Sequence, residues 1–182
     1  MSLEELFGRF RTDSLELNYS DSSVNAYLAN ENHLTNVEVS DGTSIFLVHP
    51  LHIEIQAEIN KNEKDKEKFR AKCQSAPYLQ YKENLFKLLN SKKREHKIIL
   101  VEDPLYFEHS TKKIFEQYAF EHLIETKPGT GVPVKNNIIV PGIYAPTNYV
   151  GGMHKDACAG DFAIILKRKS NQSVLSLDPV LL

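Results

Sequence analysis

The sequence predicts a mixed α/β fold, with a central, partly parallel sheet of about four to six strands covered by about three or four helices. Two observations carry this prediction. Short apolar runs that suit buried strands alternate along the chain with longer segments of helical periodicity. The composition is also that of a globular domain, with 41% hydrophobic and 25% charged residues among 182. We therefore expect a single globular domain over residues 1–182.

A short amphipathic helix is expected at the N-terminus, over about residues 2–11. Its apolar stripe has helical spacing and consists of Leu3, Leu6, Phe7 and Phe10. Ser2 followed by Glu5 has the pattern of a capping box. We expect the helix to dock on the protein's own core; the alternative is a contact with a partner protein or a second copy of the chain.

The next elements are expected to be strands. Residues 12–42 are polar, and only two short pieces there alternate as strands do, Leu15–Leu17 and Val37–Val39. The run Thr43–Val48 predicts a buried strand. After Pro50, the period-two pattern of Leu51–Gln56 favours another strand, and a helix over Ile53–Ile59 is the competing interpretation.

The middle of the chain predicts helices around one strand. The charged stretch Asn60–Lys72 suits a solvated helix or loop. Pro77 suits the first turn of a helix whose buried stripe would be Tyr78, Tyr81, Leu85, Leu88 and Leu89. His96–Val101 predicts a second buried strand. A helix should begin near Ser110 and share one apolar face among Ile114, Phe115, Tyr118, Ala119, His122 and Leu123.

The last third is expected to complete the sheet. Asn137–Val140 predicts a third central strand, and a glycine-rich loop follows at residues 151–160. The apolar run Phe162–Lys167 predicts a fourth strand. The turn at Ser170–Gln172 would pair that strand with Val174–Leu177 in a C-terminal antiparallel hairpin.

Charge and cysteine content narrow the function classes. The net charge of −2 gives no basic surplus, so nucleic acid is not an expected partner. The apolar runs are too short to cross a membrane. Cys73 and Cys158 are far apart in a chain with no secretory signal, which indicates a cytoplasmic protein with two reduced thiols.

The loop that contains Cys158 gathers reactive side chains. It carries His154 and two aspartates and is flanked by Gly151 and Gly152. A thiolate beside an imidazolium is a nucleophile at neutral pH, so a thiol-dependent enzyme is one hypothesis. The alternative is that Cys158 packs as a small apolar side chain. A metal site is not expected, because no second cluster of ligands is evident.

Two His-x-Thr triplets form a second candidate site, His33-Leu34-Thr35 and His109-Ser110-Thr111. The pair resembles the signature of the two-histidine phosphoesterases. That resemblance covers six residues and implies that one histidine acts as base and the other as acid, while the hydroxyls hold phosphate oxygens. The simpler interpretation of Ser110 or Thr111 is the N-cap of the helix expected there.

A third candidate site lies where strands end. His49 follows the run Thr43–Val48, and Glu102 and Asp103 follow His96–Val101. In open parallel sheets, ligands bind outside the carboxyl ends of the strands. We expect His49, Glu102, Asp103 and Tyr144 to meet at that edge if the two strands are neighbours. The alternative is that Asp103-Pro104 is a turn and Glu102 is solvated.

The leading hypothesis from the sequence is a metal-independent phosphodiester hydrolase that acts on a nucleotide-like small molecule without a cofactor. Its catalytic residues would be His33, Thr35, His109 and Thr111. The substrate would contact His49, Glu102, Asp103, Tyr144, His154 and Cys158. The alternatives are a non-catalytic interaction or assembly protein, which would use the N-terminal helix, and a thiol-dependent enzyme built on Cys158.

Overall fold

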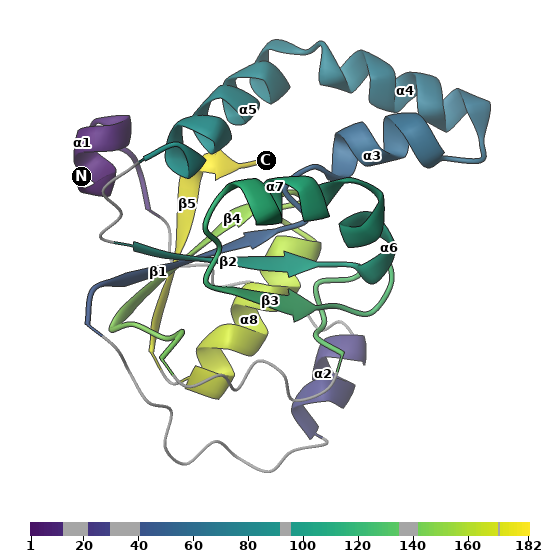
Figure 1. Ribbon diagram of the computed structural model, residues 1–182. Coiled ribbons are helices and arrows are strands. Elements are labelled where there is room, and N and C mark those ends of the chain that lie inside the picture. The colour runs from purple at the N-terminus through teal and green to yellow at the C-terminus, as the bar shows by residue number, and fades with distance from the viewer. Residues whose placement is uncertain (13–21, 30–40, 92–95, 135–141, 171) are drawn as a thin grey trace.

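The fold is organised around one parallel sheet. The computed structural model describes residues 1–12, 22–29, 41–91, 96–134, 142–170 and 172–182. In these ranges the sheet has five strands in the order β3-β2-β1-β4-β5, and every pair is parallel (Figure 1). The strands are β1 (Thr43–Val48), β2 (His96–Glu102), β3 (His122–Glu125), β4 (Thr147–Gly152) and β5 (Ser173–Leu181).

Helices cover both faces of the sheet because its strands are apolar on both sides. Ile45 and Leu47 of β1 pack under one helical layer, whereas Phe46 and Val48 pack under the other. The first layer includes α1 (Leu3–Phe7), α3 (His52–Ile59), α5 (Ala76–Leu89) and α7 (Lys112–Gln117). The second includes α2 (Ser22–Ala29) and α8 (Cys158–Ser170). The described chain also contains α4 (Glu63–Cys73), α6 (Pro104–Tyr106) and the π-helical turn η1 (Phe107–Thr111).

The strand order creates a switch point beside β1. The chain passes from β1 to β2 on one side of it, and β4 then pairs with the opposite side of β1. The helices after β1 cover one face of the sheet, and α8, after β4, covers the other. Connections that leave neighbouring strands toward opposite faces open a crevice at the carboxyl ends of those strands. The carboxyl ends of β1 and β4 are therefore the part of the sheet best placed for a site.

Several predicted elements are confirmed. The strand Thr43–Val48 is β1, and the run that begins at His96 is β2. The five residues of the predicted stripe on α5 are all buried, and Pro77 lies in its first turn. The N-terminal helix has both hydrogen bonds of the capping box, but it is shorter than expected and ends at Phe7. Its side chains Leu3 and Leu6 are buried in the protein's own core.

The prediction of a C-terminal antiparallel hairpin is wrong. The run Phe162–Lys167 lies inside α8, and β5 runs parallel to β4 rather than antiparallel to a preceding strand. A short apolar run cannot by itself distinguish a strand from a helix that is buried on most sides. Helix α8 is of that kind, because eight of its first nine residues, Ala159 to Leu166, are buried. The strand that precedes it, β4, was missed because its glycines indicated a loop.

Three other segments also differ from expectation. Ser110 lies within the turn η1, α7 begins only at Lys112, and it ends at Gln117, so that His122 and Leu123 belong to β3 instead. The segment after Pro50 is helical, which agrees with the competing interpretation rather than with a strand. The expected strands Leu15–Leu17, Val37–Val39 and Asn137–Val140 lie outside the described residues.

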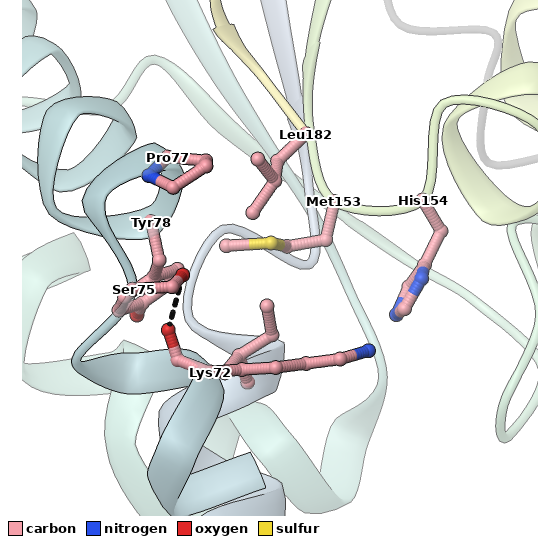
Figure 2. A pocket seen from close by; sticks show the side chains of 8 residues that line it. Lys72, Ser75, Pro77, Tyr78, Met153, His154 and Leu182 are labelled. Carbon is pink, nitrogen blue, oxygen red and sulfur yellow. Dashed lines mark hydrogen bonds between the residues drawn. The ribbon is translucent and has the colours of Figure 1, made fainter. Parts of the chain in front are cut away.

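A cavity of about 260 Å³ lies in the first helical layer, next to the carboxyl end of β4 (Figure 2). It is lined by Ile53, Lys72, Ser75, Pro77, Tyr78, Met153, His154 and Leu182. The α4–α5 junction therefore faces the segment that follows β4 and the end of β5.

Across the described ranges, we find no helix with the length and apolar character needed to cross a membrane.

Candidate functional site

The site begins with a buried ion pair between two adjacent strand ends. Parallel pairing aligns Val48 with Val101, which places His49 beside Glu102. The His49 Nδ1 atom and the Glu102 Oε1 atom are 2.5 Å apart, and the two side chains are 1% and 0% exposed. The backbone of His49 has φ +46°, an uncommon conformation for a residue other than glycine, and it directs the chain out of β1 toward α3. The pairing of strands thus fixes the imidazole in one orientation.

The segment that follows β4 brings Cys158 to the carboxyl edge of the sheet where this ion pair lies. Gly152 has φ +113°, and a Cβ atom there would lie 1.9 Å from the Val48 carbonyl oxygen, so only glycine allows β4 to approach β1 this closely. The His154 carbonyl oxygen then accepts hydrogen bonds from the backbone N–H groups of Ala157 and Ala159. This turn places Cys158 at the first residue of α8.

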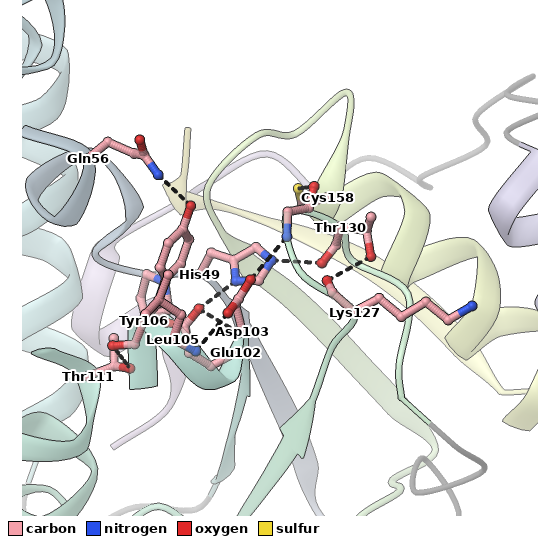
Figure 3. A network of polar contacts seen from close by, with 12 residues as sticks. His49, Gln56, Glu102, Asp103, Leu105, Tyr106, Thr111, Lys127, Thr130 and Cys158 are labelled. Atoms are coloured by element: carbon pink, nitrogen blue, oxygen red, sulfur yellow. Dashed lines mark hydrogen bonds and ion pairs between the residues drawn. The ribbon is translucent and has the colours of Figure 1, made fainter. Parts of the chain in front are cut away.

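The turn Gly129-Thr130-Gly131, which we call the glycine turn, closes over the two side chains (Figure 3). The His49 Nε2–H group donates to the Thr130 carbonyl oxygen at 2.9 Å. The Cys158 Sγ atom lies 3.9 Å from the Gly129 carbonyl oxygen. A Cβ atom on Gly131 would lie only 1.8 Å from the Cys158 carbonyl oxygen. The glycine turn is therefore packed directly against the backbone of Cys158.

Asp103 ties the glycine turn to the end of β2. One carboxylate oxygen accepts from the backbone N–H of Leu105 at 2.8 Å and caps α6. The other accepts from the backbone N–H of Gly129 at 3.0 Å. The Asp103 N–H itself donates to Glu102 Oε1 at 3.0 Å. One carboxylate thus fixes the glycine turn relative to the acidic member of the ion pair.

The electrostatic environment favours a charged imidazole at His49. Burial alone lowers the pKa of His49, but the hydrogen bonds with Cys158 and Glu102 and the negative charge of Glu102 together raise it to about 10. Both ring nitrogens donate, one to a carboxylate and one to a carbonyl, as an imidazolium requires.

Two further histidines near this centre are held neutral. The rings of His52 and His154 are 4.5 Å apart, and the ring of His52 is 6.4 Å from that of His49. Burial, followed by the charges of neighbouring groups, lowers the pKa of His52 to about 3. Burial also lowers the pKa of His154, and the charges of His49 and Lys72 add to that effect. The positive charge of this three-histidine group therefore resides on His49.

The structure brings together most of the side chains expected at strand ends. His49, Glu102, Asp103 and Cys158 form one connected network, and His154 borders it. Tyr144 is not part of that network. It is fully buried, lies before β4 begins, and packs at 6.2 Å from the ring of Phe46 in the core.

Of the His-x-Thr residues, Thr111 alone borders this network among those that the structure describes, since it is among the groups that lower the pKa of Glu102 (Figure 3). His33 and Thr35 fall outside the described residues. His109 is on the turn η1, and its Nε2 atom is 2.9 Å from the exposed Glu58 carboxylate. The buried Thr111 hydroxyl donates to the Tyr106 carbonyl oxygen at 3.2 Å. The second triplet is thus part of a helical turn rather than a strand.

Sequence reasoning missed the groups that act through their backbones. The carbonyl oxygen of Thr130 leaves no signal in residue type, and the glycine at Gly131 indicates a turn but not which backbone packs against it. The signal that was available was the position of His49, Glu102 and Cys158, each of which follows an apolar or glycine-rich run. Among the described residues, no group of three or more histidine, cysteine or acidic side chains is arranged to hold a metal ion.

Comparison with known proteins gives no independent guide to this site, because the chain matches no protein-family model, no curated protein and no solved structure.

Proposed function

We propose that this protein catalyses acyl transfer through a thioester on Cys158, with His49 as the acid and base and Glu102 as the residue that orients His49. One arrangement carries the proposal. The buried His49 ring pairs through Nδ1 with the Glu102 carboxylate and donates through Nε2 to the glycine turn, which packs against Cys158. The Cys158 thiol is among the groups that raise the pKa of His49, and the three residues follow or end three different strands. Nucleophile, base and orienting carboxylate in this order make up the arrangement used for covalent catalysis.

The proposed reaction has two steps. The Cys158 thiolate attacks the carbonyl carbon of the substrate, a carbon–sulfur bond forms, and the bond to the leaving group breaks. The leaving group takes the proton held by the His49 imidazolium. Water, an alcohol or an amine then attacks the thioester, His49 accepts the proton of that acceptor, and the Cys158 sulfur leaves as the thiolate.

The Glu102 carboxylate has two roles in this scheme. It accepts from Nδ1, so proton transfer falls to the other ring nitrogen, Nε2, which must exchange the Thr130 carbonyl oxygen for the reacting group. The negative charge also stabilises the imidazolium in an environment with little water. The two effects are the same ones that an orienting carboxylate supplies to the histidine of a catalytic triad.

The direct test is detection of the acyl-enzyme. Incubation with p-nitrophenyl acetate should release a burst of p-nitrophenol and add one acetyl group to the intact protein, and mass mapping should place it on Cys158. Cys158→Ala should abolish the burst. His49→Ala and Glu102→Gln should slow it by about 10³-fold or more and about 10²-fold respectively, on the scale of general-base catalysis. Acetylation of wild type and Cys158→Ala at equal rates would exclude the proposal.

Cys73 provides an internal control for reactivity. Burial raises the pKa of the Cys73 thiol, with the charge of Glu54 as the next cause. It should therefore react more slowly with iodoacetamide than Cys158, the proposed nucleophile. Equal alkylation of the two cysteines in the folded protein would argue against activation of Cys158.

Two predictions from the sequence remain open. Phosphodiester hydrolysis by the His-x-Thr triplets would have to survive chelators and disappear in both His33→Ala and His109→Ala. A partner that binds the N-terminal helix would have to use surface other than Leu3 and Leu6, since both are buried against this chain.

A further inference from the structure

The cavity beside β4 is apolar in most of its lining. Ile53, Met153 and Leu182 give it aliphatic walls, and Pro77 and Tyr78 close the side formed by α5 (Figure 2). Ile53 and Met153 are 5% and 1% exposed, so these walls belong to the packed core rather than to mobile surface side chains. A water molecule occupies roughly 30 Å³ in the liquid. A cavity of 260 Å³ therefore has room for a hydrocarbon chain on the order of six to eight carbons.

His154 connects this cavity to the thiol. It lines the cavity, and its carbonyl oxygen accepts the hydrogen bonds that form the turn leading to Cys158. On the other side its ring contacts His52, which in turn lies beside His49. His154 is thus a cavity-lining residue that also belongs to the turn before Cys158, and the proposed substrate passes it between the two.

Four lining residues carry polar groups, namely Lys72, Ser75, Tyr78 and His154. Lys72 stretches along one side, and its ammonium points toward His154 (Figure 2). Its charge contributes to the lowered pKa of both neighbouring histidines, after burial and the histidine charges. Because His52 and His154 are neutral, a hydrocarbon chain that passes them meets no charged imidazole. The interior thus suits an apolar group, and the charged end of Lys72 stays outside it.

We propose that the cavity binds the hydrocarbon part of the acyl group that Cys158 transfers. The substrate class is then a carboxylic ester, thioester or amide with an apolar acyl group. That group could be an alkanoyl chain or an apolar aminoacyl residue, which share the chemistry that the cavity recognises. This inference rests on the proposed function, which it extends by assigning the acyl-group pocket.

A chain-length series tests the pocket. For p-nitrophenyl esters from acetate to octanoate, kcat/KM should rise by up to about fourfold for each added methylene until the cavity is full. Esters of N-acetylglycine and N-acetylleucine form the second arm. A gain confined to the alkanoyl series assigns an alkanoyl chain, and a gain confined to leucine over glycine assigns an aminoacyl residue; either result supports the pocket.

A filled cavity should remove the preference. Leu182 lines the cavity at the chain end, so Leu182→Trp should lower the octanoate-to-acetate ratio of kcat/KM by about tenfold or more. Leu79→Trp is the matched control, since Leu79 lies on α5, is 53% exposed and does not line the cavity. It should leave the ratio unchanged. A ratio near one in wild type, or one that Leu182→Trp does not alter, overturns the pocket assignment.

The two proposals fail in different ways. If no ester, acetate included, gives a burst that depends on Cys158, the proposed function fails. Binding of sodium octanoate to Cys158→Ala then tests the cavity alone, by calorimetry and competition with a fluorescent fatty acid. Octanoate that binds Cys158→Ala but not the Cys158→Ala, Leu182→Trp double variant supports an apolar-ligand site. A Cys158-dependent burst with no chain-length preference and no octanoate binding rejects the pocket and retains the function.

Discussion

Substitution of Gly131 by alanine should disable the site while leaving the sheet intact. The added Cβ atom would lie 1.8 Å from the Cys158 carbonyl oxygen, whereas ordinary contact begins at 3.4 Å. The glycine turn and the start of α8 must therefore separate by about 1.6 Å, which exceeds the roughly 1 Å misplacement that can cost 10²-fold in rate. We expect the p-nitrophenol burst of Gly131→Ala to fall by about 100-fold or more.

The assay for this variant needs a readout that separates a displaced thiol from an unfolded protein. Mass spectrometry after iodoacetamide treatment reports the alkylation of Cys158 and of Cys73 separately. In a folded variant, Cys73 should still be alkylated slowly. Gly8→Ala is the control: Gly8 has φ +72° and no atom within 4 Å of an added Cβ, so alanine there should cost about 1–2 kcal/mol of backbone strain without touching the site. Wild-type burst kinetics in Gly131→Ala would refute the packing argument.

Three further predictions follow from the same geometry. Because the folded-state pKa of His49 is raised above 6.5, its pairing should stabilise the protein fully below pH 6.5 and lose that contribution up to about pH 10. This loss has a slope approaching 1.4 kcal/mol per pH unit; urea titrations between pH 6 and 10.5 should show it in wild type and not in Glu102→Gln. Gly152→Ala should destabilise the fold by about 3 kcal/mol or more, measured by chemical denaturation, because its Cβ would collide with the Val48 carbonyl group and its φ of +113° disfavours any side chain. Leu85→Ala should cost about 2–5 kcal/mol in the same assay, since Leu85 is fully buried in the first helical layer; a loss below 1 kcal/mol would mean that α5 packs loosely.

The central strands could be predicted from the sequence because their apolar runs are uninterrupted. The same runs located His49 and Glu102, since the first polar residue after a parallel strand lies at the carboxyl edge of the sheet. Their proximity required only that the two strands be neighbours, and β1 and β2 are. This part of the site was accessible to simple pattern analysis.

The identity of the partner for Cys158 could not be predicted in that way. His154 was the nearest histidine in sequence, but its backbone carbonyl shapes the turn, and the imidazole whose pKa the thiol raises belongs to His49. Tyr144 was expected at the same edge because the preceding segment suited a strand. The strand that reaches the site is instead β4, which begins after Tyr144 and leaves that residue in the core.

Helix α8 shows why local pattern failed at the C-terminal end. Every residue from Ala159 to Leu166 is buried where the helix lies between the sheet and α2. This stretch has no exposed polar face to reveal a period of 3.6 residues. The sequence pattern alone could not show whether this segment is a helix or one strand of an antiparallel hairpin. The parallel pairing of β4 with β5 decides for the helix.

The distribution of the site along the chain has a consequence for biosynthesis. His49 and Glu102 are separated by 53 residues, and Cys158 follows still later, on the segment between the two last strands of the sheet. During synthesis the Cys158 thiol emerges after His49 and Glu102, and it is near neither until β4 has joined the far side of β1. On the proposed mechanism, Cys158 should therefore not be acylated in the nascent chain. Its acylation by an ester would then report that β4 has been added to the sheet.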